Sequence, residues 1–342
     1  MAPVIRAFKR IGEEFFIVHS GQHYSYYLDD VFFEQLRIPK PKYDLGVGSG
    51  SHAEQTGKML IGIERVLIHE NPSIVLVQGD TNTTLAGALA AVKLGIPIGH
   101  VEAGLRSFDW NMPEEINRRL CDHVSSLLFA PTERAKENLL KEGISSDKVY
   151  VTGNTIVDSV YQNLELADQN THILDKFGVK SESYFLVTVH RQENVDNLNR
   201  FRRILEGLKL IHEHYGLPVI YPVHPRALKR MREFKLNPIG LTLIEPVDYL
   251  AFLKLEKEAK LILTDSGGVQ EEACILGVPC VTLSDNTERP ETLDVGANIL
   301  AGTYPESILE KVGIMLERRR DWVNPFGDGR AGERIVNILL NC

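Results

Sequence analysis

Several side chains that can transfer protons follow segments typical of buried strands. Asp80, His100 and Glu102 lie at or just beyond the ends of apolar, β-branched runs, and Glu114 follows Pro113 at the expected start of a helix. Positioned carboxylates and imidazoles act as general acids and bases, so these residues are candidates for proton transfer. Two of them also have a structural interpretation, because Asp80 could cap the following helix and Glu114 could complement a helix dipole.

Two histidines end strand-like segments in the second half of the chain. His190 is followed by Arg191, and His224 is followed closely by Arg226. Histidine and arginine side chains at the ends of neighbouring strands are typical of groups that bind a shared anion.

A glycine pair between a strand and a helix is the strongest signal for an anion site. Ser266, Gly267 and Gly268 open the expected helix, where free backbone N–H groups can bind phosphate and glycine allows close approach. Glu272 lies further along that helix and could accept hydrogen bonds from ribose hydroxyls. Arg289 lies at the expected start of a later helix. It could belong to a capped, solvated helix start, or it could be a further ligand of a phosphate or sugar.

The elements that must position these residues alternate between strands and helices, which predicts an α/β protein with two Rossmann-like, doubly wound domains. We expect the N-terminal domain over residues 1–165 and the C-terminal domain, which carries the expected anion site, over 166–326. A final helix within 327–342 is expected to return to the first domain. The expected strands are Phe15–His19, Ile74–Gln78, Ile96–Val101, Leu127–Ala130, Val149–Thr152, Phe185–Val189, Val219–Val223, Leu241–Ile244, Leu261–Thr264 and Cys280–Leu283.

Composition excludes several classes of function. The 342 residues carry a formal net charge of -8, which argues against a nucleic-acid surface. No apolar run reaches the roughly 20 residues that span a bilayer, and the first residues do not show the order of basic, apolar and small residues of a signal peptide. We therefore expect a cytoplasmic protein without membrane partners. The four cysteines, Cys121, Cys274, Cys280 and Cys342, have no metal-ligand spacing, so no metal is expected.

Seven ordered motifs together resemble the non-hydrolysing UDP-N-acetylglucosamine 2-epimerase family, over nearly the whole chain. They are Gly79-Asp80-Thr81, Val101-Glu102-Ala103-Gly104-Leu105-Arg106, Pro113-Glu114-Glu115, Val189-His190-Arg191, His224-Pro225, Asp265-Ser266-Gly267-Gly268 and Thr287-Glu288-Arg289-Pro290-Glu291. The resemblance implies a glycosyltransferase-B-like fold with an active-site cleft between the two domains, and a homodimer. It also implies interconversion of UDP-N-acetylglucosamine and UDP-N-acetylmannosamine through a 2-acetamidoglucal intermediate.

The resemblance also implies roles for individual residues. Asp80, Glu102 and Glu114 would form the acid/base set at C2 of the sugar, and His190 would stabilise the departing diphosphate. No cofactor and no metal are implied. The residues implied to bind UDP are His224, Ser266, Gly267, Gly268, Glu272 and Arg289.

Two segments depart from the family pattern. Members normally open with a strand and a Gly-Thr-Arg-Pro-Glu turn, whereas this sequence begins with the helix-like Met1-Ala2-Pro3-Val4-Ile5-Arg6. We therefore expect weakened or absent activity for the chain as given. Gln22 and His23 match part of an allosteric UDP-sugar region, but the neighbouring Gly48-Ser49-Gly50-Ser51-His52 does not.

Other functions fit parts of the same pattern. A relative could epimerise another UDP-sugar, such as a diacetamido-uronic acid, or could hydrolyse its substrate and release N-acetylmannosamine. A glycosyltransferase shares the expected fold, but the three carboxylates in the first domain favour elimination chemistry. A sensor that binds a nucleotide sugar without reaction is the third alternative.

Overall fold

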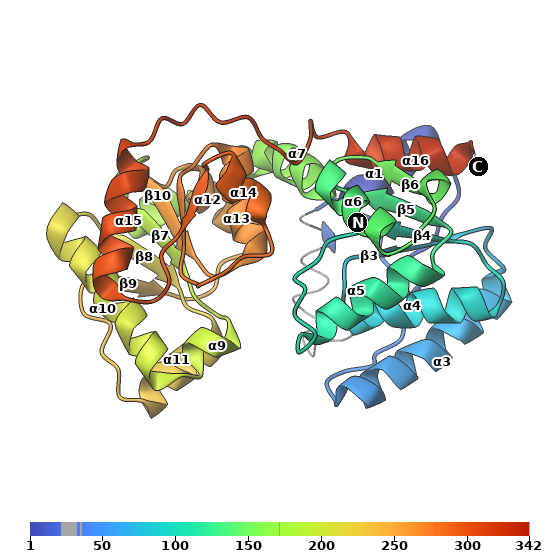
Figure 1. Ribbon diagram of the computed structural model, residues 1–342, viewed down its shortest axis with the longest axis horizontal. Coiled ribbons are helices and arrows are strands. Elements are labelled where there is room, and N and C mark those ends of the chain that lie inside the picture. The colour runs from blue at the N-terminus through green and yellow to red at the C-terminus, as the bar shows by residue number, and fades with distance from the viewer. Residues whose placement is uncertain (22–32, 35, 171, 342) are drawn as a thin grey trace. The chain divides into compact units, whose positions relative to one another are not determined.

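The computed structural model describes residues 1–21, 33–34, 36–170 and 172–341. The chain forms two compact units, one of Met1–Ser159 with Phe326–Cys342 and one of Val160–Pro325. Strands and helices alternate along both units (Figure 1).

The first unit is built on parallel strands. Four of them form a sheet in the order β3-β4-β5-β6, and β1 and β2 form a separate pair. The strands are β1 (Val18–His19), β2 (Tyr43–Asp44), β3 (Val75–Gln78), β4 (Ile98–Val101), β5 (Leu127–Ala130) and β6 (Val149–Val151). The helices are α1 (Ala2–Ile11), α3 (His52–Glu70), α4 (Asn82–Lys93), α5 (Pro113–Val124), α6 (Glu133–Lys141), the 3₁₀ turn Ser146–Lys148, α7 (Thr155–Asn170), within which the unit boundary falls, and α16 (Ala331–Leu340).

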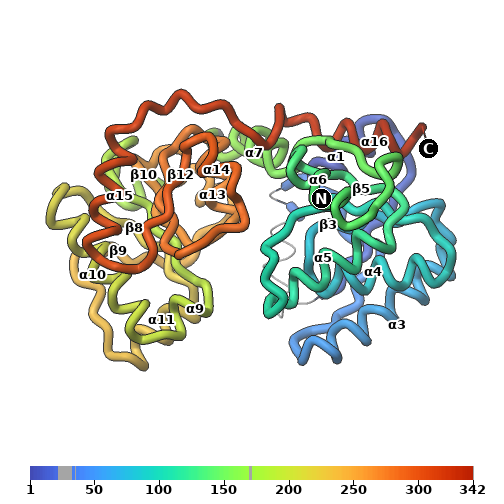
Figure 2. The backbone as a smooth tube through the Cα atoms, viewed as in Figure 1, coloured from blue at the N-terminus to red at the C-terminus, as the bar shows by residue number. Residues whose placement is uncertain are grey.

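Small residues allow the helices of the first unit to pack closely. The alanines of α4 are buried and let this helix lie against α3, beside Met59 and Ile98. Helices α1 and α16 are far apart in sequence but lie side by side (Figure 2). A Cβ atom on Gly332 would lie 2.8 Å from the carbonyl oxygen of Pro3, so only glycine fits where these two helices meet.

The second unit contains one six-stranded parallel sheet with the order β12-β11-β10-β7-β8-β9, which is the order of a Rossmann fold. Its strands are β7 (Phe185–Thr188), β8 (Val219–Pro222), β9 (Leu241–Ile244), β10 (Leu261–Thr264), β11 (Cys280–Thr282) and β12 (Asn298–Leu300). Its helices are α8 (Ile173–Phe177), α9 (Gln192–Val195), α10 (Leu198–Tyr215), α11 (Pro225–Glu233), α12 (Tyr249–Lys257), α13 (Gly267–Leu276), α14 (Pro290–Asp294) and α15 (Pro305–Glu317).

Both faces of this second sheet are covered, so its central strands are apolar throughout. One core contains Phe185, Phe201 and Ile308 under α10 and α15, and the other contains Leu186 and Leu255 under α12 and α13. Buried parallel strands require such continuous apolar runs. The α/β fold with two Rossmann-like parallel sheets is therefore confirmed.

The expected strands occur within one to three residues of their observed ends. Two observed strands were not expected, namely β2 and β12. Each is only partly buried and contains a polar residue, so neither forms an apolar run. No helix in the described part of the chain is both long enough and apolar enough to cross a bilayer.

Candidate functional site

The register of β3 and β4 brings two of the predicted carboxylates to one edge of the first sheet. Gln78 pairs with Val101, so Asp80 and Glu102 both follow the last paired residues. The Gln78 side-chain amide donates to the Glu102 carboxylate, and a Cβ atom on Gly79 would lie 3.7 Å from Glu102 Oε2. Asp80 and Glu102 therefore stand on either side of Gly79.

An arginine from α5 holds the Asp80 carboxylate. Arg118 donates from Nε and Nη2 to Asp80 Oδ2 at 2.9 and 2.6 Å, and Asn117 Nδ2 donates to the Asp80 carbonyl at 2.8 Å. The cap of α4 is Thr81, whose side chain accepts from the Thr84 N–H, so the interpretation of Asp80 as the cap was wrong. Asp80 is therefore oriented by a cation and remains partly exposed.

The third predicted carboxylate lies on the same helix as Arg118. Glu114 is half-buried in the first turn of α5, four residues before Arg118. Residues four apart share one side of a helix, so Glu114 and Arg118 share the side of α5 that approaches the Asp80 turn.

The backbone at Glu102 is in a left-handed conformation with φ 69°. This conformation costs a residue other than glycine on the order of 1–3 kcal/mol, and such residues cluster at active sites. The cost at Glu102 supports a functional reason for a carboxylate there.

His100 does not act at the open edge, because it is fully buried in an ionic network. Its Nδ1 lies 2.7 Å from Asp122 Oδ1, and its Nε2 lies 2.9 Å from the carbonyl oxygen of Gly79. Arg106 donates to the other Asp122 oxygen at 2.7 Å. Although burial opposes the charge, Asp122 and the Gly79 carbonyl raise the pKa of His100. The imidazolium therefore supports the turn that carries Asp80.

In the second unit, the predicted histidine and glycine motifs meet where the strand order reverses. Thr188 at the end of β7 pairs with Thr264 at the end of β10, so His190 and Asp265 emerge side by side. Ligands of open α/β sheets bind at such switch points.

Asp265 orients His190. The Asp265 carboxylate is fully buried and accepts from the backbone N–H groups of His190 and Arg191, both at 3.0 Å, and from Asn194 Nδ2 at 3.0 Å. His190 Nδ1 lies 3.2 Å from the same carboxylate. Burial opposes ionisation of Asp265, but the hydrogen bonds and charge of His190 lower its pKa overall. The carboxylate thus holds the His190 ring through Nδ1 and leaves Nε2 for a ligand.

His224 lies beside His190, with 6.4 Å between the ring centroids. Its Nδ1 accepts from the Arg226 N–H at the start of α11. Burial lowers the pKa of His224, and the charges of His190 and Arg226 lower it further. His224 is therefore a neutral hydrogen-bonding group at neutral pH.

The two arginines beside these histidines are paired with acids. Arg191 donates to both oxygens of Glu288 at 2.6 and 2.7 Å, and Arg226 binds Asp196. Each of these two guanidinium charges is therefore compensated by a carboxylate.

The glycine pair at the start of α13 serves two purposes. A Cβ atom on Gly267 would lie 2.7 Å from Glu288 Oε1, so Gly267 is required for packing. The nearest atom to a Cβ on Gly268 is Ser266 Oγ at 4.0 Å. The space beside Gly268 is open, and no acidic residue lies in the first turn of α13, as an anion site requires.

Glu272 and Arg289 are held by side chains that the sequence did not single out. The Tyr249 hydroxyl donates to Glu272 Oε1 at 3.0 Å, and Arg289 Nε lies 2.9 Å from Glu271 Oε1. Gln22 and His23 fall outside the described residues.

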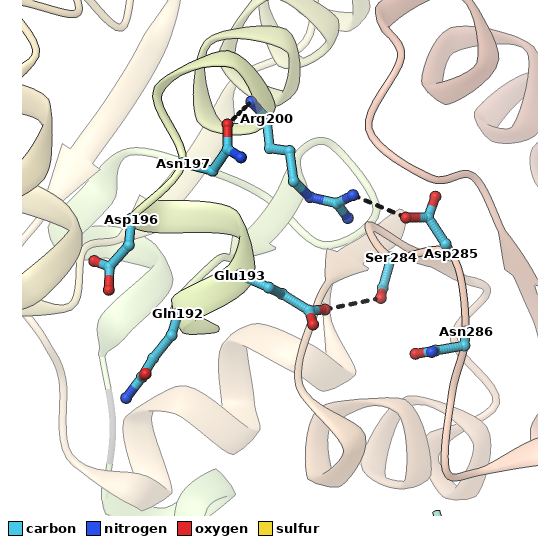
Figure 3. A pocket seen from close by; sticks show the side chains of 8 residues that line it. All are labelled: Gln192, Glu193, Asp196, Asn197, Arg200, Ser284, Asp285 and Asn286. Carbon is cyan, nitrogen blue, oxygen red and sulfur yellow. Dashed lines mark hydrogen bonds and ion pairs between the residues drawn. The ribbon is translucent and has the colours of Figure 1, made fainter. Parts of the chain in front are cut away.

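The second unit contains a cavity of about 590 Å³ (Figure 3). Its lining is Gln192, Glu193, Asp196, Asn197, Arg200, Ser284, Asp285 and Asn286. Glu193 accepts from Ser284, and Arg200 is bound to Asp285. With three carboxylates and one guanidinium, the lining is unsuited to a diphosphate, and it contains none of the predicted site residues.

Sequence reasoning left three functional partners without a role, namely Arg118, Asp265 and Tyr249. Asp265 stands inside a recognised motif, and Arg118 lies four residues after Glu114 on the same helix, so their signal was their closeness to a predicted residue. Tyr249 had no such signal.

Comparison with known proteins agrees with this arrangement. Residues 6–340 match the family described as UDP-N-acetylglucosamine 2-epimerase. The UDP-N-acetylglucosamine 2-epimerase of Methanocaldococcus jannaschii is 58% identical, over 99% of this chain and 94% of that protein. A crystal structure of the M. jannaschii enzyme in complex with UDP-GlcNAc and UDP superposes with a TM-score of 0.92, covering 100% of this chain and 96% of that one, at 58% identity.

A relative with another substrate is also similar. The UDP-2,3-diacetamido-2,3-dideoxy-D-glucuronate 2-epimerase of Pseudomonas aeruginosa is 44% identical, over 94% of this chain and 90% of that protein. The family match and these identities confirm the resemblance found in the motifs. This chain is therefore an enzyme of the UDP-N-acetylglucosamine 2-epimerase family.

Proposed function

We propose that the chain interconverts UDP-N-acetylglucosamine and UDP-N-acetylmannosamine. The observation that carries the proposal is the placement of Asp80 and Glu102 on either side of Gly79, with Arg118 on Asp80. The same substrate is supported by the name of the similar M. jannaschii enzyme and by the UDP-GlcNAc in its complex.

In the first half-reaction, a carboxylate removes the C2 proton. The electron pair of that C–H bond forms the C1=C2 double bond, and the bond from C1 to the diphosphate oxygen breaks. UDP departs with the bonding electrons and leaves 2-acetamidoglucal. In the second half-reaction, the diphosphate oxygen adds to C1, and a carboxylic acid delivers a proton to the other face of C2. We assign this acid/base set to Asp80, Glu102 and Glu114.

The departing diphosphate gains negative charge and needs a cation and hydrogen-bond donors. We assign the binding of the diphosphate to His190, which Asp265 holds through Nδ1, to the Ser266 hydroxyl, and to the N–H groups of Gly267 and Gly268. Glu272 would accept the ribose hydroxyls, and His224 and Arg289 would contact the nucleotide.

The test is proton NMR of UDP-N-acetylglucosamine incubated with the protein in deuterated water. We expect deuterium at C2 and the manno product, with neither in Asp80→Asn and Glu102→Gln variants that still bind UDP. Free N-acetylmannosamine would indicate a hydrolysing enzyme. Because the chain as given is expected to be weakly active, a version extended by a strand and a Gly-Thr-Arg-Pro-Glu turn is run beside it. Absence of exchange in both versions without an acceptor would refute epimerisation.

The similarity to the P. aeruginosa enzyme supports a second candidate substrate, UDP-2,3-diacetamido-2,3-dideoxy-D-glucuronate. The two substrates are separated by comparing kcat/KM in the same exchange assay. We expect the N-acetylglucosamine substrate to be preferred, and a higher kcat/KM for the uronate would reverse the assignment.

We also propose that the chain forms a homodimer. Ile61 and Ile68 lie seven residues apart on one face of α3 and are 53% and 64% exposed, which is unusual for isoleucine. Sedimentation of the protein and of an Ile68→Glu variant tests this, with a dimer expected for the former and a monomer for the latter. A monomeric parent protein would refute the proposal.

A further inference from the structure

Two glutamates from neighbouring helices are buried together in the second unit. Glu256 on α12 is 0% exposed and Glu272 on α13 is 8% exposed. Helices α12 and α13 pack against each other. Two ionised carboxylates in such a place would repel each other without water to screen the charge, so at least one must carry a proton.

The surroundings decide which of the two is protonated. Among the described residues, no N–H or O–H group donates a hydrogen bond to either Glu256 oxygen. Glu272 has a donor, the Tyr249 hydroxyl at 3.0 Å. Burial raises the pKa of Glu256 well above its usual range, and the adjacent Glu272 carboxylate adds to the rise. Glu256 is therefore the member that keeps its proton.

Glu272 titrates in a different range. Burial raises the pKa of Glu272 to about 7, with Glu271 adding to the rise and the donors Tyr249 and Glu256 opposing it. Among the described residues, Tyr249 on α12, Tyr184 next to β7 and Cys280 on β11 also face Glu256, and all three are neutral at this pH. Arg289 is engaged with Glu271, so the charge of Glu271 is partly compensated.

We propose that Glu256 is a positioning residue for Glu272: its carboxyl group stays protonated, donates its O–H to the Glu272 carboxylate, and holds it ready to accept the ribose hydroxyls of the substrate. The proposal rests on the proposed role of Glu272 as the ribose ligand. With Tyr249 and Glu256 as two donors, an ionised Glu272 still has about two of its roughly four acceptor positions free.

This arrangement makes nucleotide binding depend on pH. Protonation of Glu272 turns one of its acceptors into a donor and removes the negative charge, so affinity should fall as the pH drops through about 7. Without a donor at position 256, the buried Glu272 carboxylate is less stabilised, and the loss of affinity should begin at higher pH. A shift of one unit would lower the ionised fraction at pH 7 from about one half to about one tenth, a roughly fivefold loss of affinity.

The experiment is calorimetric titration with UDP between pH 5.5 and 9, for the unsubstituted protein and for Glu256→Leu, Glu256→Gln and Glu272→Gln. Glutamine keeps a donor at position 256, so Glu256→Gln should retain the original midpoint, while Glu256→Leu should shift it upward by at least about one unit. Glu272→Gln is the baseline, because the phosphate groups of UDP titrate there as usual. In parallel, NMR of glutamate labelled with ¹³C at the carboxyl group reports the titration of Glu272 without any ligand.

The outcomes separate the two levels of the proposal. An unchanged midpoint in Glu256→Leu, by calorimetry and by NMR, overturns the role of Glu256, as does an equal shift in Glu256→Gln. If Glu272→Gln binds UDP with unchanged affinity and pH dependence, the assignment of Glu272 to the ribose fails, and the positioning role fails with it. An NMR shift that appears only in Glu256→Leu, together with the matching shift in affinity, supports both.

Discussion

Replacement of His100 by glutamine should destabilise the first unit strongly, because it removes one partner of a buried ion pair. The ring donates to Asp122 at 2.7 Å and to the Gly79 carbonyl at 2.9 Å, with His100 0% and Asp122 1% exposed. Breaking a buried pair by removing one partner costs about 3–5 kcal/mol. We expect the lower end, about 3 kcal/mol, because Arg106 still holds Asp122.

The effect should depend on pH in a defined direction. The folded-state pKa of His100 is raised, so the stabilisation is fully present below the unfolded-state pKa of about 6.5 and is lost as pH rises through the folded value. The pKa of Asp122 is lowered, because the charges of His100 and Arg106 outweigh its burial, so its contribution is lost at acid pH. The difference in unfolding free energy between the parent protein and His100→Gln should therefore become smaller as the pH rises above the folded-state pKa of His100.

Urea unfolding measures this difference in unfolding free energy, called the gap below. The transition of the first unit is isolated in a Trp322→Phe background, which leaves Trp110 as the tryptophan reporter. His69→Gln is the matched control in the same unit, because the His69 side chain is 76% exposed and its loss should change the unfolding free energy by less than about 0.5 kcal/mol. A gap below about 1 kcal/mol at pH 6, or one that widens with rising pH, would refute the ionic interpretation of His100.

Three further substitutions test the site. Gly268→Ala should raise the unfolding free energy by about 0.5–1 kcal/mol, because a Cβ atom there meets nothing nearer than 4.0 Å. The same Cβ atom fills the space for the anion, so the affinity for UDP should fall at least tenfold. Unchanged affinity in calorimetry would argue against the anion site. Glu102→Gly should relieve the conformational cost of φ 69° and so raise the unfolding free energy in urea by about 1 kcal/mol or more. It should also abolish exchange at C2. A lower unfolding free energy would show that the Glu102 side chain supports the fold. Arg118→Lys keeps the positive charge but loses the two-point contact with Asp80. We therefore expect kcat to fall roughly tenfold while the affinity for UDP is retained. An unchanged kcat would remove Arg118 from the mechanism.

The sequence predicted the sheets of both units well, for a reason visible in the core. Strands such as Leu261–Thr264 are buried on both faces, so they must be apolar throughout, and the pattern stands out from the helices around them. The two strands that were missed, Tyr43–Asp44 and Asn298–Leu300, each contain a polar residue and are only partly buried, so neither stands out as an apolar run.

The edge on which the candidate residues lie also followed from the sequence. Parallel strands end at the same edge, so residues just beyond Gln78 and Val101, or beyond Thr188 and Thr264, must lie together. The order of motifs along the chain was sufficient to identify the family.

Only the tertiary structure decided which side chains pair and which of them are charged. Asp80 meets Arg118, 38 residues away, and Glu256 meets Glu272 across two helices. His100 follows the same kind of strand as its neighbours, but its ring is enclosed by Asp122 and Gly79. Charge state depends on desolvation and on the partner that packing supplies, and neither is a local property of the sequence.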